Sequence, residues 1–105
     1  MDRIAQLEAF LKEDPDDPFN TYALALEYAK LDVQKAHDLF DQLITAHPNY
    51  LPTYYPYAHL LIDLREDDKA GRVFMQGIEI AKRNNNQKTL KELTGAYDNW
   101  LFERT

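Results

Sequence analysis

The 105-residue chain contains no cysteine, which excludes disulfide bonds, thiolate nucleophiles and zinc sites built on thiolates. Basic residues are outnumbered, with 12 Lys and Arg against 18 Asp and Glu and a formal charge of −6. Proteins that bind phosphate backbones usually carry a basic face, so we expect no nucleic-acid partner. No run of apolar residues is long enough to span a membrane, and the first fourteen residues carry charges throughout. We therefore expect neither a signal peptide nor a membrane span, and a cytoplasmic location.

Glycine is also scarce, with 3 in the whole chain, and β-branched residues are few beside Ala, Leu, Lys, Glu and Gln. This composition favours helix over sheet. Apolar residues recur at three- and four-residue steps, as in Ile4, Leu7, Phe10 and Leu11. No segment shows the strict alternation that is typical of a half-buried strand. The sequence predicts a single all-α domain.

The chain contains an internal repeat. Four residues recur 33 positions later, where Leu7, Phe10, Leu11 and Pro15 match Phe40, Leu43, Ile44 and Pro48. Farther along the spacing becomes 34, so that Ala36, Phe40, Leu43 and Ile44 match Ala70, Phe74, Gly77 and Ile78. One residue fewer in the first predicted hairpin turn than in the second explains both spacings. We expect helices near residues 2–14, 18–31, 33–47, 51–64, 67–83 and 86–103.

Each copy of the repeat has a signature on its first and second helix. The first copy reads Thr21-x2-Leu24-Ala25-x2-Tyr28, then Ala36-x3-Phe40 and Pro48, and the second reads Tyr54-x2-Tyr57-Ala58-x2-Leu61, then Ala70-x3-Phe74. This pattern resembles the tetratricopeptide repeat (TPR), and the chain as a whole resembles short, stand-alone bacterial TPR proteins. Thr21 stands where a bulky aromatic is usual, and Lys82 where proline is usual. Phe40 and Phe74 are expected to be buried between adjacent hairpins.

The resemblance implies a right-handed stack of antiparallel helical hairpins. Residues 1–15 are expected to form a helix like the second helix of a repeat, followed by repeat 1 at 18–50 and repeat 2 at 51–84. Residues 86–103 are expected to form a closing helix. One hairpin cannot bury its own apolar face, so about three stacked units are needed for stability. The closing helix is therefore interpreted as a cap.

The segment YLPTYYPY concentrates four tyrosines and two prolines in eight positions. Tyr54 and Tyr57 fall on positions that pack against the second helix of the same repeat. Pro52 suits a helix start, because a first-turn N–H has no intrahelical partner. Pro56 lies one turn inside the expected helix, where it removes a donor and disfavours helical geometry at Tyr55. Two interpretations of Pro56 stay open: it reorients Tyr55, or the helix tolerates it.

Helical spacing turns Tyr55 away from the packed face, together with His59 and Ile62. The equivalent stripe of the first repeat contains Tyr22 and Leu26. The TPR resemblance implies that this stripe lines a concave groove in which peptides bind, and it is apolar for an exposed face. We therefore predict a protein-interaction module that binds a peptide or helix of unknown identity on Tyr22, Leu26, Tyr55, His59 and Ile62. Coverage of part of the stripe by a neighbouring helix is the alternative.

No catalytic or metal-binding motif is found. His37, His47 and His59 form no metal-binding pair, and the acidic turn at 13–17 lacks the glycine that a calcium loop needs. There is no phosphate-binding glycine loop and no nucleophile–base arrangement. The lysine and asparagine with which chaperone-binding TPR proteins clamp a carboxylate are missing from the stripe. The sequence predicts a protein that is not an enzyme and has no cofactor or metal.

Self-association through the closing helix is the alternative function. The apolar side of this helix carries Leu90, Leu93 and Tyr97. Trp100, Leu101 and Phe102 follow and together exceed what a cap needs. One of these three is expected to stay exposed and to pair with another copy. The alternative prediction is therefore a structural helical-repeat protein that forms a homodimer.

Overall fold

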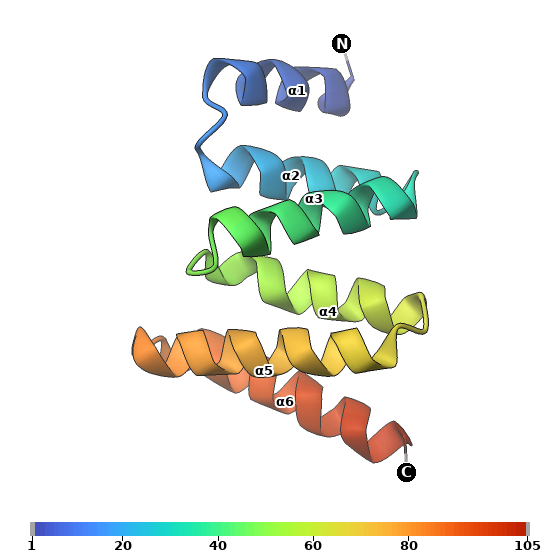
Figure 1. Ribbon diagram of the computed structural model, residues 1–105, viewed down its shortest axis with the longest axis vertical. Helices are drawn as coiled ribbons and strands as arrows, with labels where there is room; N and C mark the ends of the chain where they lie inside the picture. Colours follow the sequence, from blue (N-terminus) through green and yellow to red (C-terminus); the bar gives the residue numbers. More distant parts are fainter. Residues whose placement is uncertain (1, 105) are drawn as a thin grey trace. The chain divides into compact units, whose positions relative to one another are not determined.

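The computed structural model describes residues 2–104, and the chain is all-α throughout these residues (Figure 1). The helices are α1 (Arg3–Glu13), α2 (Pro18–Tyr28), α3 (Val33–Ala46), α4 (Tyr54–Asp63), α5 (Asp67–Arg83) and α6 (Gln87–Arg104), with a 3-10 helix, η1, at Leu51–Thr53. Contacts divide the chain into two compact units, the first ending at Thr53 and the second beginning at Tyr54. The predicted all-α fold is confirmed.

Two of the predicted helix bounds need correction. The second helix ends at Tyr28 rather than at residue 31, because the N–H groups of Lys30 and Leu31 bond to carbonyls only three residues earlier. Residues 51–53 form η1 rather than the first turn of α4. Pro56 has no N–H to donate to the Pro52 carbonyl, so an α-helical bond cannot form there. The backbone changes from a 3-10 helix to an α-helix at this point and continues as α4.

Aspartates begin the helices of the first unit. Three carboxylates accept backbone N–H hydrogen bonds at helix starts: Asp2 from Ala5 (2.7 Å), Asp17 from Phe19 (3.0 Å) and Asp32 from Lys35 (3.2 Å). The predicted start at Asp17 and Pro18 is confirmed, with proline in the first turn. Such caps each contribute about 1 kcal/mol to helix stability, so short helices such as α1 depend on them.

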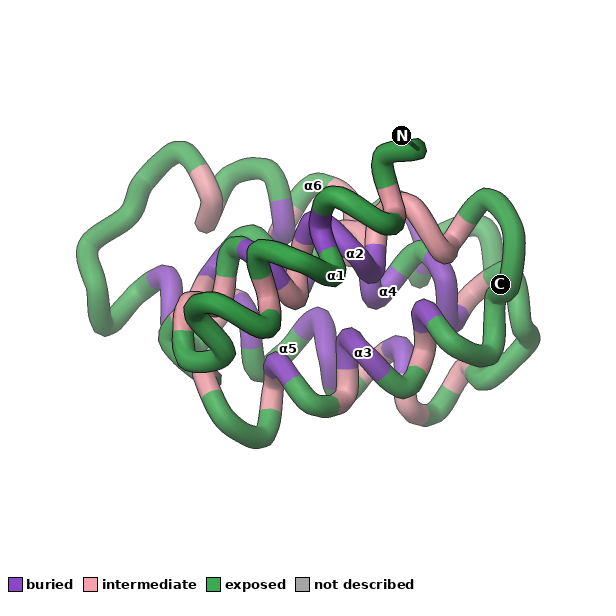
Figure 2. The backbone as a smooth tube through the Cα atoms, turned by 90° about the horizontal axis from the view of Figure 1, so that it is seen from above, coloured by how far each residue is buried: buried purple, intermediate pink, exposed green. Residues whose placement is uncertain are grey.

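In the first unit, α2 packs against both α1 and α3. Buried apolar positions recur along the helices between exposed ones (Figure 2). Ala25 of α2 and Ala36 of α3 are fully buried, and their small side chains let these helices approach closely. Asn20 is buried as well, and its amide Nδ2 donates to the carbonyls of Phe10 (3.3 Å) and Asp14 (3.2 Å). This amide ties the start of α2 to the end of α1.

In the second unit, α5 packs against both α4 and α6. Tyr54 and Tyr57 are fully buried, as predicted, and burial raises the pKa of Tyr54 to about 12. Phe74 is also fully buried, with its ring centroid 5.5 Å from that of Tyr97 and 5.7 Å from that of Trp100. The predicted burial of both repeat phenylalanines is confirmed, because Phe40 is buried too.

The turns of the second unit are built alike. Arg65 and Asn85 adopt left-handed backbone conformations, with φ of 62° and 57°. In each turn the following N–H bonds to a carbonyl five residues earlier, Glu66 to Leu61 and Asn86 to Ala81, both at 2.9 Å. This pattern satisfies carbonyls at the end of the preceding helix and reverses the chain. The two turns hold α4, α5 and α6 as successive antiparallel neighbours.

Two glycines of this unit give a matched test of the packing. A β-carbon on Gly77 would lie 2.7 Å from Cβ and 2.8 Å from Cγ of Tyr54. Because Tyr54 is fully buried, we expect Gly77→Ala to lower the free energy of unfolding by about 1–3 kcal/mol. A β-carbon on Gly95 would meet no atom within 4 Å. Gly95→Ala should therefore raise the free energy of unfolding by up to about 1 kcal/mol.

Urea denaturation of both variants beside the wild type measures these opposite changes. Gly95→Ala is the control, because it makes the same chemical change in a helix without the contact. Equal effects of the two substitutions would contradict the close packing of α5 on Tyr54.

Candidate peptide-binding surface

In the second unit the predicted surface lies on α4. Tyr55, His59 and Ile62 share one face because they are separated by four and three residues. Tyr55 is 47% exposed, His59 is exposed, and Ile62 is half-buried. Tyr54 and Tyr57, by contrast, are fully buried in the same helix. Tyr55 therefore projects from a side of α4 that the core does not use.

Tyr55 and His59 form an aromatic pair. Their ring centroids lie 4.6 Å apart, with the planes inclined by 53°. The His59 ring in turn stands edge-on to Phe74, at 6.2 Å and 81°. Tyr55 contacts its neighbour on the same helix and His59 also contacts the core, so the rotamers of both side chains are restricted. Less side-chain entropy is then lost when a ligand covers them, which favours binding at this position.

In the first unit the predicted residues are Tyr22 and Leu26 of α2, and both are half-buried. The Tyr22 ring stands edge-on to the ring of Tyr50, at 5.7 Å and 67°. Burial raises the pKa of the Tyr22 hydroxyl and also that of Tyr50. Both hydroxyls therefore remain protonated donors at neutral pH. No role for Tyr50 is predicted from the sequence, because the path of a connecting segment does not follow from helical spacing.

The surface offers hydrogen-bond donors and aromatic area rather than charge. Within residues 2–104, no three His, Cys, Asp or Glu side chains are grouped so that they could hold a metal ion. In the same residues, no helix has the length and apolarity to cross a membrane. His37 lies apart from the stripe on α3, with Nδ1 3.7 Å from a carboxylate oxygen of Asp38. The stripe residues themselves are two tyrosines, a histidine and two aliphatic side chains.

The closing helix divides its three terminal apolar residues between core and surface. Trp100 is buried against Phe74 and Tyr97, and the Arg104 guanidinium lies 4.6 Å from its ring centroid. Leu101 is partly exposed, and Phe102 is 81% exposed. The prediction that one of the three stays exposed is confirmed by Phe102. Trp100, however, is a core residue in this unit and is not available for a homodimer contact.

No protein-family model and no curated protein sequence matches the chain. Solved structures do match. A solution NMR structure of a tetratricopeptide repeat domain protein from Salinibacter ruber is 42% identical, with a TM-score of 0.75, over 80% of this chain and 86% of that chain. A crystal structure of a tetratricopeptide repeat domain protein from the same organism is 40% identical, with a TM-score of 0.73, over 77% of this chain and 92% of that chain.

Proposed function

Because the chain belongs to the tetratricopeptide-repeat family, we propose that it is an interaction module that binds a peptide or helix through the first-helix stripes of its repeats. The family and the helical-repeat fold predicted from the sequence are confirmed. Members of this family are generally non-enzymatic scaffolds for protein interaction. The proposal therefore includes no catalytic step and no cofactor.

The exposed Tyr55–His59 pair is the observation that supports the binding mode. An aromatic ring that is held in place but uncovered offers a large rigid contact area at a low entropic cost. The phenol hydroxyl adds one hydrogen bond to a peptide backbone. Ile62 adds an aliphatic side chain to the proposed stripe on α4, and Leu26 adds one to the proposed stripe on α2 of the first unit. The proposed ligand is a peptide or helix with apolar side chains. The net charge of −6 disfavours a strongly acidic one.

We predict that Tyr55→Ala separates binding from stability. The variant should melt almost as the wild type does, because half of the side chain is already exposed. A peptide selected on the wild-type chain from a random library should bind it at least about 1 kcal/mol more weakly. Isothermal titration with that peptide, beside a thermal melt, measures both quantities.

Tyr57→Ala is the control, because it removes the same side chain from a fully buried position two residues away. It should melt clearly earlier than the wild type. If Tyr55→Ala melts as early as Tyr57→Ala, Tyr55 belongs to the core. If it binds the selected peptide unchanged, recognition uses another surface.

Self-association is the second candidate function, and the exposure of Phe102 favours it. A symmetric contact of two α6 helices would bury this ring and that of Leu101. Phe102→Ser should then abolish any rise of molecular mass with concentration in sedimentation equilibrium. Unchanged association of Phe102→Ser would exclude this contact.

A further inference from the structure

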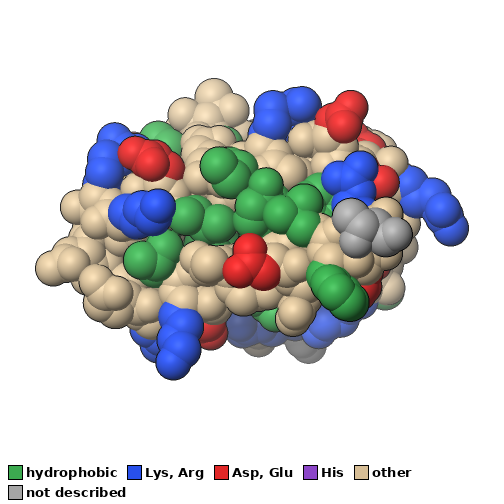
Figure 3. Space-filling model, turned by 90° about the horizontal axis from the view of Figure 1, so that it is seen from below, with side chains coloured by type: hydrophobic (Ala, Val, Ile, Leu, Met, Phe, Trp, Pro, Cys, Tyr) green, Lys and Arg blue, Asp and Glu red, His purple; other side chains and the backbone are tan. Residues whose placement is uncertain are grey.

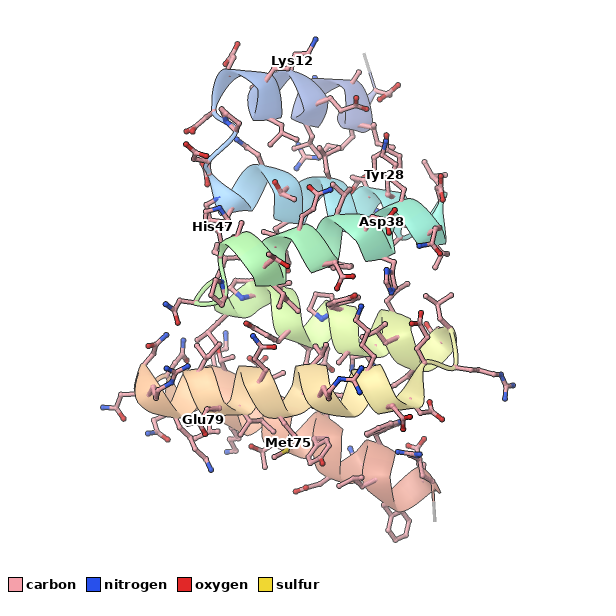
Figure 4. The ribbon with its side chains drawn as sticks, viewed as in Figure 1. Lys12, Tyr28, Asp38, His47, Met75 and Glu79 are labelled. Carbon is pink, nitrogen blue, oxygen red and sulfur yellow. The ribbon has the colours of Figure 1, made fainter. Side chains whose placement is uncertain are left out.

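An open groove of about 780 Å³ runs between α5 and α6. Met75 and Ile78 of α5 and Leu90 and Tyr97 of α6 form its apolar lining. Met75 is more than half exposed and projects from the side of α5 where α6 lies (Figure 4). Apolar side chains gather along the middle of the molecular face that is seen from below (Figure 3). The packing of the second unit leaves this apolar surface uncovered.

The groove is open because α6 has the pattern of a first helix but no second helix follows it in the described residues. Leu90-x2-Leu93-Thr94-x2-Tyr97 matches Tyr54-x2-Tyr57-Ala58-x2-Leu61 of α4. The α4 residues Tyr54, Ala58 and Leu61 are fully buried, and α5 packs directly against Tyr54 at Gly77. The equivalent residues of α6, Leu90, Thr94 and Tyr97, are only half-buried. Within residues 2–104, no helix covers α6 as α5 covers α4.

At the other end of the sequence, α1 is a second-type helix with no first-type helix before it in the described residues. Its Leu7 and Phe10 match Phe40 and Leu43 of α3 in the internal repeat. Leu43 is 1% exposed, whereas Phe10 is 50% exposed. The position at which a second helix contacts its own first helix is therefore apolar and uncovered on α1.

We propose that the α1 helix of a second copy of this chain occupies the groove between α5 and α6, in the arrangement that α3 has on α2 and that α5 has on α4. In that register Phe10 of the second copy lies on Leu90, since Gly77 occupies the equivalent position over Tyr54. The contact joins two different surfaces, so each copy retains one free α1 and one free groove. This head-to-tail association is independent of the peptide-binding stripes.

The charges at the two ends of the groove support this occupant. Helices in the hairpins of this chain run antiparallel (Figure 1), so α1 would lie antiparallel to α6. Arg3, beside the capping Asp2, then comes near Asp98 of α6. At the other end of α1, Glu13 and Asp14 outnumber Lys12 and come near the two lysines that line the groove, Lys82 and Lys91. The net acidic end of α1 therefore meets the basic end of the groove, and the reverse orientation would bring it to Asp98 instead.

Gly95 gives a separate reason to expect a helix in this groove. Glycine inside a helix destabilises it relative to alanine, and no described atom lies within 4 Å of the place of its β-carbon. The packing of this chain therefore does not require a glycine there. Gly95 lines the groove, where the missing side chain lets a second backbone approach closely.

Two single variants test the proposal, each of which blocks one half of the contact. Phe10→Lys places a charge against Lys82 and Lys91, and Gly95→Arg fills the groove and faces Arg3 of the second copy. Both positions are exposed, so both variants should fold, which circular dichroism and thermal melting check. The average molecular mass of the wild type should rise with concentration in sedimentation equilibrium. The dissociation constant of each variant alone should be at least about tenfold higher than that of the wild type.

An equimolar mixture of the two variants gives the decisive measurement. Gly95→Arg retains an intact α1 and Phe10→Lys retains an intact groove, so the mixture should form a 1:1 heterodimer and nothing larger. If either variant fails to fold, a charge exchange provides a second test. Lys91→Glu is expected to weaken association, and the double variant Lys91→Glu/Glu13→Lys is expected to restore it.

Three results would overturn the proposal. One is a wild type that stays monomeric up to about 1 mM, the range of very weak complexes. Another is a variant mixture that forms no heterodimer although both variants fold. The third is loss of association in Phe102→Ser but not in Phe10→Lys, which would assign the contact to a symmetric pairing of α6 helices instead.

Discussion

Replacing Phe74 with alanine is expected to lower the free energy of unfolding by about 3–5 kcal/mol, a large share of the stability of a small domain. The ring is fully buried and contacts both of the other helices of the second unit, α4 and α6. It meets His59 of α4 at 6.2 Å, and Tyr97 and Trp100 of α6 at 5.5 and 5.7 Å between centroids. Removing it leaves a cavity between helices that cannot all move inward together, so both the transfer and the cavity costs apply.

Urea denaturation followed by circular dichroism measures this loss as a lower midpoint at an unchanged slope. Phe19→Ala is the matched control, because it removes the same ring from a half-exposed position at the start of α2. Its effect should stay within about 0.5 kcal/mol, as is usual for surface substitutions. A Phe74→Ala variant as stable as Phe19→Ala would contradict the placement of Phe74 in the core.

Much of the core could be predicted from the sequence, because helical period and repeat spacing are both properties of residue order. Tyr54, Tyr57, Phe40 and Phe74 follow from these two regularities together with the TPR pattern that they match, and all four are buried. The start of α2 could also be predicted from the sequence. An aspartate side chain accepts a hydrogen bond from a first-turn N–H, and the proline that follows it has no N–H that needs a partner. Local rules suffice where the decisive partner lies within a few residues.

Features that depend on a distant partner could not be predicted. Asn20 looks like an ordinary polar helix residue until the end of α1 brings two carbonyls to its amide. Trp100 and Phe102 are both large and apolar, and only the position of Phe74 decides that the first of them is buried. The 3-10 turn before α4 required knowing how a missing donor at Pro56 changes the winding.

The candidate surface was predicted in part. Helical spacing places Tyr55, His59 and Ile62 on one face, and the structure leaves Tyr55 and His59 exposed. Spacing does not fix rotamers, so the contact of Tyr55 with His59 came only from the structure. The partner of Tyr22 is Tyr50, which lies 28 residues farther along in a connecting segment. The role of these residues in binding stays a prediction.

Ending the chain after Asn86 is expected to abolish the cooperative unfolding of the second unit. This cut removes α6, and with it the buried side chains of Leu93 and Trp100. Losing one such side chain already costs about 2–5 kcal/mol, so losing both approaches the whole stability of a small domain. Without α6, Phe74 loses two of its aromatic neighbours and the apolar side of α5 faces water. A solenoid whose end helix is missing exposes surface that should aggregate or bind hydrophobic dyes.

A chain that ends at Leu101 is the matched control for this truncation. It keeps Leu93, Tyr97 and Trp100 in place and removes the highly exposed Phe102 together with Arg104, whose guanidinium lies over the Trp100 ring. An exposed cation–π contact contributes only about 0.5–1 kcal/mol, so the control should remain folded and melt within a few degrees of the full chain. Light scattering, dye binding and thermal melts compare the two truncations. If the chain that ends at Asn86 stays monomeric and melts like the control, α6 does not cover the core of this unit, and the assignment of the helix as its cap is wrong.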